Sequence, residues 1–152
     1  MNCLIKWGAV ILLLHPIIQL SAIVLSCYVF YLGFQRFRIL YLKHHAHFQW
    51  KRHVNLGTLA FCILLMGMAG GITMVRIYWH RFFMTGIHGK VALVMIPFIL
   101  FGFFSGFYMN TVKKKRTILP LIHGINNFCT LILALSQIMT GLMVYYHFVL
   151  TY

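Results

Sequence analysis

The stretch HGINNFCTLILALSQIMTG, residues 123–141, decides the fold. It contains no Lys, Arg, Asp or Glu, and with its apolar flanks it exceeds the roughly 20 residues that a helix needs to cross about 30 Å of hydrocarbon. Its polar and small residues return at intervals close to the helical period of about 3.6 residues, so they share one side of a helix. The stretch therefore predicts a transmembrane helix with one distinctive face.

Three other apolar stretches of membrane length accompany it. We expect spans at about residues 8–34, 53–75, 87–109 and 118–148, joined by connections too short to hold another domain. The first stretch is not followed by a small-residue cleavage site, so we interpret it as an uncleaved span rather than a signal peptide. The predicted fold class is all-α: one domain over residues 1–152, forming an integral-membrane antiparallel four-helix bundle.

The composition excludes many functions. The 152 residues include 13 Lys and Arg, nine His and no Asp or Glu, for a formal net charge of +13. Paired-carboxylate hydrolysis, Ser-His-Asp triads and carboxylate-bound Mg²⁺ or Ca²⁺ all need an acidic residue. The four Cys form no Cys-x-x-Cys motif, which argues against c-type haem attachment and an iron–sulfur cluster. Because hydrophobic residues make up 62% of the chain, the charge indicates membrane topology and an anionic partner rather than nucleic acid.

The basic residues are divided unevenly between the two sides of the predicted bundle. The first and third connections carry nine of them: Arg36, Arg38, Lys43, Lys51, Arg52, Lys113, Lys114, Lys115 and Arg116. The other side has four: Lys6, Arg76, Arg81 and Lys90. The positive-inside rule then puts the first and third connections in the cytoplasm and both termini on the non-cytoplasmic side.

Four histidines occupy matching places, one near the start of each span. They are His15, His53, His88 and His123. Each is followed, 18 residues later on the same helical face, by a glycine: Gly33, Gly71, Gly106 and Gly141 respectively. Gly57 and Gly102 lie on the same faces. A stripe of small residues alone is typical of close helix packing, but a histidine inside the membrane in all four spans is costly and indicates function.

Antiparallel spans place these histidines in two layers. We expect His15 and His88 towards the outer face, and His53 and His123 towards the cytoplasmic face. Two histidines that face each other at one depth are the axial ligands of a six-coordinate b-type haem, and glycine leaves room for the flat macrocycle. The pattern predicts two haem b groups, each with two histidine ligands to iron. A single haem, with the other pair structural, is the alternative.

Several short motifs resemble the four-helix core of the cytochrome b561 family. They are the His-Pro pair at 15–16, Arg52-His53, and the His-Gly pairs at 88–89 and 123–124. Residues 119–141, with Leu-Pro, His-Gly, Asn-Asn and Gln-x-x-Thr-Gly, are similar to an uncharacterised bacterial four-helix membrane family that is distantly similar to cytochrome b561. The resemblance covers nearly the whole chain and implies transmembrane electron transfer between two haems. The chain lacks the extra flanking helices of the ascorbate-using members, so their ascorbate and ferric-reductase activities are not implied.

We therefore expect an electron-transfer subunit of an oxidoreductase rather than a stand-alone enzyme, in a bacterial inner or photosynthetic membrane. The expected partners are other membrane subunits or an acidic soluble redox protein, together with anionic lipid, and a quinone is a further candidate. One alternative is a pigment-binding or structural subunit of a photosynthetic or respiratory complex, in which a single histidine binds chlorophyll magnesium. The other is a transition-metal transporter lined with histidine.

The remaining polar residues have simpler interpretations. We interpret His44, His45 and His47 as a solvated cluster rather than a metal site, and His47 is a fallback ligand for His53. An aromatic belt at the outer face is expected near His80 and His147: Trp79, Tyr145, Tyr146 and Tyr152. Four intramembrane amides are expected to bond between helices: Gln19, Asn126, Asn127 and Gln137. Met95 and Met139 are interpreted as gap fillers. The expected partners of the haem propionates are Arg36, Arg38, Lys51 and Arg52 on the cytoplasmic side and Arg76, Arg81 and Lys90 outside.

Overall fold

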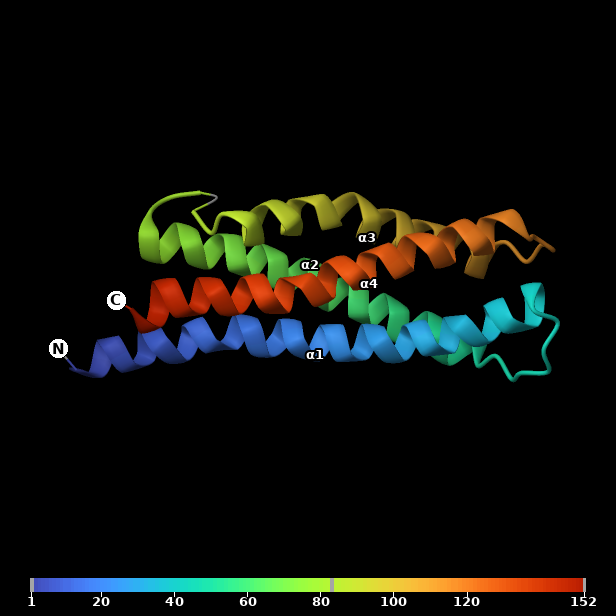
Figure 1. The fold of residues 1–152 in the computed structure, drawn as a ribbon, viewed down its shortest axis with the longest axis horizontal. Coiled ribbons are helices and arrows are strands. Elements are labelled where there is room, and N and C mark those ends of the chain that lie inside the picture. Colours follow the sequence, from blue (N-terminus) through green and yellow to red (C-terminus); the bar gives the residue numbers. More distant parts are fainter. Residues whose placement is uncertain (1, 83, 152) are drawn as a thin grey trace.

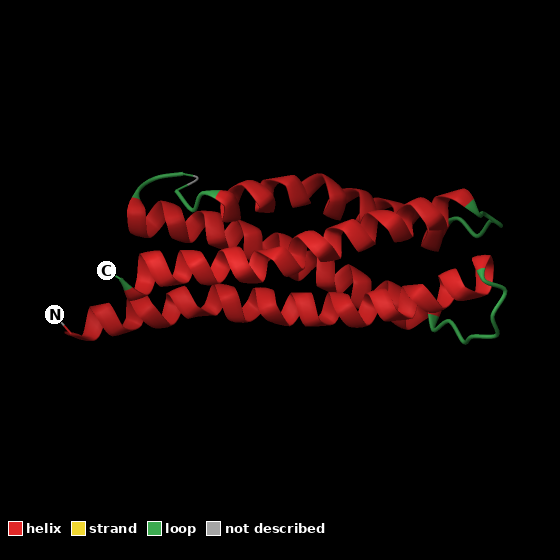
Figure 2. Cartoon of the chain, viewed as in Figure 1, coloured by secondary structure: helices red, strands yellow, loops and turns green. Residues whose placement is uncertain are grey.

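The structure is a computed structural model that describes residues 2–82 and 84–151, with side chains at 12–82, 84–148 and 150–151. Tyr152 and the side chain of Lys6, both used in the sequence analysis, lie outside the described residues. Four long helices follow one another: α1 (Asn2–Tyr41), α2 (Trp50–Trp79), α3 (Ile87–Thr111) and α4 (Ile118–Tyr145). A π-helical turn, η1 (Tyr146–Leu150), continues α4. The described residues contain no strand, as Figure 2 shows, and the predicted all-α fold class is confirmed.

All four helices are long and apolar enough to cross a membrane, and the chain is a multi-pass membrane protein by this criterion. Large apolar side chains cover the outside of the bundle, for example Val24, Met66 and Phe107. Such a surface suits lipid, since hydrocarbon rather than water is then its solvent. The first helix is longer than the predicted 8–34 and ends at Tyr41; in its last turns Phe37 stacks on Phe34 and contacts the ring of Tyr41 in a tilted arrangement.

The helices run antiparallel, and the bundle has two distinct ends (Figure 1). Both termini and the α2–α3 connection lie at one end, which we call the terminal end. The α1–α2 and α3–α4 connections lie at the other end, which we call the basic end because Lys43 and the run from Lys113 to Arg116 are there. Around the bundle, α1 packs on α2 and α4, and α3 packs on α4 and α2. Helices α1 and α3 are therefore on opposite sides of the bundle axis, as are α2 and α4.

Local contacts close the bundle at both ends. At the terminal end α2 stops at His80, which has the left-handed φ of 53° typical of the residue after a helix, and whose backbone N–H donates to the Arg76 carbonyl. Arg76 returns a guanidinium hydrogen bond of 2.8 Å to the His80 carbonyl. At the basic end the Tyr41 hydroxyl donates to the Thr117 carbonyl and joins the end of α1 to the start of α4.

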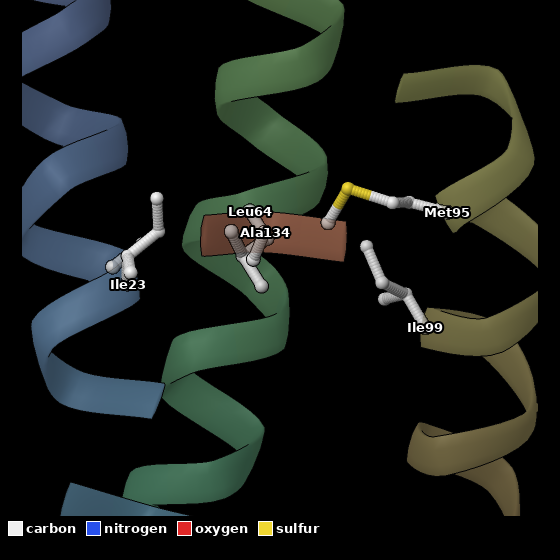
Figure 3. Close-up of a cluster of buried hydrophobic side chains, with 6 residues drawn as sticks. Ile23, Leu64, Met95, Ile99 and Ala134 are labelled. Carbon is white, nitrogen blue, oxygen red and sulfur yellow. The ribbon is translucent and has the colours of Figure 1, made fainter. Parts of the chain in front are cut away.

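The core is a small apolar cluster about midway along each helix. Its buried members come from all four helices: Ala22, Ile23, Leu64, Met95, Ile99 and Ala134. Figure 3 shows Ile23, Leu64, Met95 and Ile99 pointing into the space between their helices, with Ala134 beside Leu64. Met95 is thus a core residue, whereas Met139 is 63% exposed on the outer surface. The cluster separates the terminal end of the bundle from the basic end.

Candidate functional site

Two pairs of histidines face each other across the bundle axis. His15 on α1 and His88 on α3 have ring centroids 6.4 Å apart with an angle of 84° between the ring planes. His53 on α2 and His123 on α4 have ring centroids 6.4 Å apart with an angle of 76°. These are the pairs that the sequence analysis assigned to two layers, one towards the terminal end and one towards the basic end. We call them the terminal pair and the basic-end pair.

The spacing within each pair suits one metal ion between two imidazoles. A metal–imidazole bond is about 2.0 Å long and a ring nitrogen lies about 1.1 Å from the ring centroid, so two rings on opposite sides of one iron have centroids about 6.2 Å apart. Both observed distances are 6.4 Å. The described residues contain no group of three or more His, Cys, Asp or Glu side chains that could hold a metal ion. Each site therefore has two nitrogen ligands from the part of the chain that the structure describes.

Each histidine ring lies against the glycine predicted at the far end of the neighbouring helix. A Cβ at Gly71 would lie 2.8 Å from Cε1 of His15, and a Cβ at Gly33 would lie 3.0 Å from Cε1 of His53. The corresponding distances are 3.3 Å from Gly141 to His88 and 3.2 Å from Gly106 to His123. The spacing of 18 residues puts each glycine level with a histidine of the antiparallel neighbour. The sequence analysis assigned the glycines to the edge of a macrocycle; in the structure they accommodate the imidazole rings.

The two other predicted glycines pack elsewhere. A Cβ at Gly57 would lie 3.3 Å from Val29, so this glycine lets α1 and α2 approach closely. Gly102 faces the side chains of Asn127 and Phe61. Both positions allow close packing, and neither touches a histidine ring.

Hydrogen bonds at Nδ1 orient three of the four rings. His53 Nδ1 lies 3.1 Å from the Val29 carbonyl, and because a carbonyl only accepts, Nδ1 carries the proton. His123 Nδ1 lies 2.8 Å from Ser105 Oγ, which itself donates to the Gly102 carbonyl and so accepts from the ring. Metal-binding histidines are typically held in this way, with the other nitrogen left free for the metal.

In the terminal pair, only one of the two histidines has a hydrogen-bond partner at Nδ1. His88 Nδ1 lies 3.1 Å from Thr140 Oγ1, whose hydroxyl donates within α4. His15 Nδ1 is buried and makes no hydrogen bond of normal geometry. Three of the four rings thus have a hydrogen-bond partner at Nδ1, and His15 is positioned by packing against Gly71.

Two cavities open beside the two pairs. The cavity at the terminal end has a volume of about 440 Å³ and is lined by His15, His88, Gly71 and Gly141. The cavity at the basic end has a volume of about 1460 Å³ and is lined by the other predicted site residues: His53, His123, Gly33, Gly57, Gly102 and Gly106. Leu64 and Ala134 line both cavities, so a single layer of side chains separates them.

The two cavities differ in charge. Among the described residues, no Lys or Arg lines the terminal cavity. The basic-end cavity is lined by Arg36, Lys113, Lys114, Lys115 and Arg116. Of the cations that the sequence analysis proposed as propionate partners, only Arg36 is among these lining residues. The run 113–116 was missed, although four consecutive cations directly before the fourth span were a visible signal.

Three of the other proposed cations are engaged elsewhere. Arg52 lies 5.9 Å from the ring centroid of Tyr28, and Arg76 lies 5.1 Å from that of Phe82. Arg38 donates to Gln35. Because the chain has no side-chain carboxylates, aromatic faces are the available counterparts for guanidinium groups.

The remaining histidines stay outside both cavities. His44, His45 and His47 are exposed, and Phe48 rather than His47 lies beside His53, with ring centroids 5.5 Å apart. His47 is therefore not positioned as a fallback ligand. His80 and His147 are also exposed.

The expected hydrogen bonds between helices are confirmed for three amides. Gln19 donates to the Leu64 carbonyl, Asn126 to the Phe98 carbonyl and Gln137 to the His88 carbonyl. Asn127 differs, because its amide donates to His123 Nε2 within α4.

No family model, curated protein or solved structure matches the chain. The resemblance to cytochrome b561 stays a prediction, and the geometry of the two histidine pairs is what bears on function.

Proposed function

We propose that the protein is a membrane cytochrome b that carries electrons across the bilayer through two haems, as the electron-transfer subunit of an oxidoreductase. The observation that carries the proposal is the pair of facing imidazoles, repeated at two depths with the same 6.4 Å spacing. Two imidazoles and four porphyrin nitrogens complete the six ligands of haem iron. A structural zinc ion would need about four protein ligands, and the described residues offer only two at each site.

The residues around each pair fit this role. His15 and His88 would hold one haem, and His53 and His123 the other. Val29, Ser105 and Thr140 keep the proton on Nδ1 of their histidines. Nε2 of His53 and His88 can then donate its lone pair, whereas Nε2 of His123 accepts a hydrogen bond from Asn127. When bound, haem would supply one-electron oxidation and reduction.

The two cavities suit a pathway from one side of the membrane to the other. They lie towards opposite ends of the bundle and share Leu64 and Ala134 in their linings. An electron would therefore pass a single layer of apolar side chains between the two sites. At the basic end, Arg36 and the run from Lys113 to Arg116 offer positive charge to the propionates.

The proposed orientation follows from the charges of the connections. We place the basic end in the cytoplasm of a bacterial inner or photosynthetic membrane, with both termini on the other side. The excess positive charge there favours anionic lipid, an acidic soluble redox protein or a neighbouring subunit as partner. A quinone remains a candidate electron donor or acceptor.

The second candidate function is binding of a photosynthetic pigment. Chlorophyll magnesium takes one histidine as a fifth ligand, so a pigment site needs no second histidine on the opposite side. The facing pairs therefore favour haem.

The test is the haem-to-protein ratio and absorption spectrum of the purified protein from haem-replete cells. We expect two low-spin b haems with an α band on reduction, and loss of one haem in each of His88→Ala and His123→Ala. His147→Ala, which changes an exposed histidine outside both pairs, should keep two. A folded but colourless protein would overturn the proposal. One haem per protein, with that haem lost in only one of the two variants, would establish the single-haem alternative.

A further inference from the structure

His123 differs from the other paired histidines at the nitrogen that would bind iron. The Asn127 side-chain amide lies 2.9 Å from His123 Nε2 and donates to it. In the described part of the chain, no hydrogen bond reaches Nε2 of His15, His53 or His88. One of the four candidate ligand atoms is thus already engaged by the protein.

The direction of this hydrogen bond is fixed by its neighbours. Asn126 donates to Asn127 Oδ1 at 3.2 Å, which identifies the other atom of the Asn127 amide as the donor facing His123. On the opposite edge of the ring, His123 donates from Nδ1 to Ser105, and Ser105 donates to Gly102. The hydrogen bonds run in one direction from Asn126 to Gly102, so the Nε2 lone pair accepts a hydrogen bond from the Asn127 amide.

Gln19 offers a natural comparison. It lies four residues after His15, as Asn127 lies four residues after His123, and it packs against Gly67 as Asn127 packs against Gly102. Its amide donates to the Leu64 carbonyl on α2 instead of to the histidine. The same helical position therefore carries an amide in both sites, and only the one at the basic end engages the ligand nitrogen.

We propose that Asn127 is a latch on the basic-end site, a positioning residue that holds His123 Nε2 by a hydrogen bond and must release it before this nitrogen binds iron. The inference rests on the proposed haem function. A lone pair that accepts a hydrogen bond from Asn127 is not available to a metal, so the Asn127–His123 hydrogen bond is exchanged for the iron–nitrogen bond. The latch lowers the affinity of the basic-end site for haem by slowing its loading, and it leaves haem release unchanged.

The test uses the full chain in detergent, prepared without haem and titrated with ferric haem b. His88→Ala leaves only the basic-end pair, so binding to that site is measured alone. Adding Asn127→Leu to this variant should raise the affinity about three- to tenfold, the equivalent of one hydrogen bond that no longer has to be broken. The higher affinity should come from a faster association rate, because the Asn127–His123 hydrogen bond exists only before haem binds. A general change in packing would alter the dissociation rate of haem as well.

The matched control is Gln19→Leu in the His123→Ala protein, where only the terminal pair remains. Because Gln19 holds a backbone carbonyl rather than His15, its removal should not raise haem affinity. If both single-site proteins fail to bind haem, the cytochrome proposal itself fails. If they bind haem but Asn127→Leu gives unchanged or lower affinity, only the latch is refuted.

A second measurement needs no variant to fold. In the protein labelled with ¹⁵N-histidine and prepared without haem, the Nε2 resonance of His123 should lie upfield of that of His53, since an acceptor nitrogen moves upfield when hydrogen-bonded. Coincident resonances would overturn the latch.

A second substitution at the same position checks the titration. Asn127→Ala should raise the haem affinity as Asn127→Leu does, and a rise in one variant with a fall in the other would refute the latch.

Discussion

Gly71 of α2 lies against the imidazole of His15 on α1, so closely that a methyl group on Gly71 would be 2.8 Å from Cε1 of the ring. That distance is shorter than carbon atoms tolerate without movement. The ring sits opposite His88 and makes no hydrogen bond of normal geometry through Nδ1. Its position in the terminal pair is therefore maintained by packing, and Gly71 is the residue that permits it.

Gly71→Ala should displace His15 and weaken the terminal site selectively. Overpacking at a closely packed position costs about 1–3 kcal/mol, and here the ring is the group most able to move. We expect the variant to lose the haem of the terminal pair while keeping that of the basic-end pair, measured by the haem-to-protein ratio and the spectrum.

The neighbouring Gly70→Ala is the matched control, since a Cβ there would meet nothing within 4 Å. It should keep both haems. Equal haem loss in the two variants would mean that residues 70–71 act through helix stability and not through contact with His15.

Ser105→Ala tests the hydrogen bond that orients His123. The substitution removes the acceptor of the Nδ1 proton, at 2.8 Å in the structure. Loss of such a partner typically lowers metal affinity about 10- to 100-fold, so haem binding to the basic-end site should fall by this factor in the His88→Ala background.

Ser21→Ala provides the comparison, because Ser21 bonds a carbonyl within its own helix and is exposed. It should leave the titration unchanged. An unchanged affinity in Ser105→Ala would show that His123 needs no partner at Nδ1 to bind haem.

The sequence predicted the helices and the histidine pairs for simple physical reasons. Hydrocarbon thickness sets the length of a span, and antiparallel order puts every second histidine at the same depth. The step of 18 residues also placed Gly33 level with His53, and Gly71 level with His15. The spacing alone does not show which group lies against each glycine. The edge of a macrocycle and an imidazole ring both require a residue without a Cβ at that position.

Other features depend on side-chain directions that periodicity does not encode. Asn127 and Gln19 hold equivalent positions after their histidines, yet one amide bonds a ring nitrogen and the other a carbonyl. Arg52 directly precedes His53 but lies over Tyr28, outside the cavity. The path of the α3–α4 connection, closed by the bond from Tyr41 to Thr117, brings Lys113 to Arg116 to the cavity instead.

Ile99→Ala should destabilise the bundle without altering the ligands. Ile99 is fully buried in the apolar cluster between the two cavities. Removing a buried Ile side chain costs about 2–5 kcal/mol. Unfolding of the purified protein in detergent should show a loss of this size, with the spectrum of bound haem retained.

Ile132, 49% exposed on the outer surface, gives the control: Ile132→Ala should change stability by less than about 0.5 kcal/mol. A similar loss in the two variants would mean that the bundle is held mainly by its outer surface, in contrast to the clustered core in Figure 3.

The orientation of the chain can be tested with two matched cysteine variants in a background without native cysteines. His45→Cys lies in the exposed α1–α2 connection at the basic end, and His80→Cys is exposed at the terminal end. With the basic end in the cytoplasm, a membrane-impermeant thiol reagent should label His80→Cys in intact bacterial spheroplasts and His45→Cys only after permeabilisation. The reverse pattern would invert the proposed direction of the bundle, and labelling of both before permeabilisation would mean that the chain inserts in two orientations. Because neither histidine belongs to a pair, the haem content of both variants should equal that of the parent, so the topology is measured on protein with both sites intact.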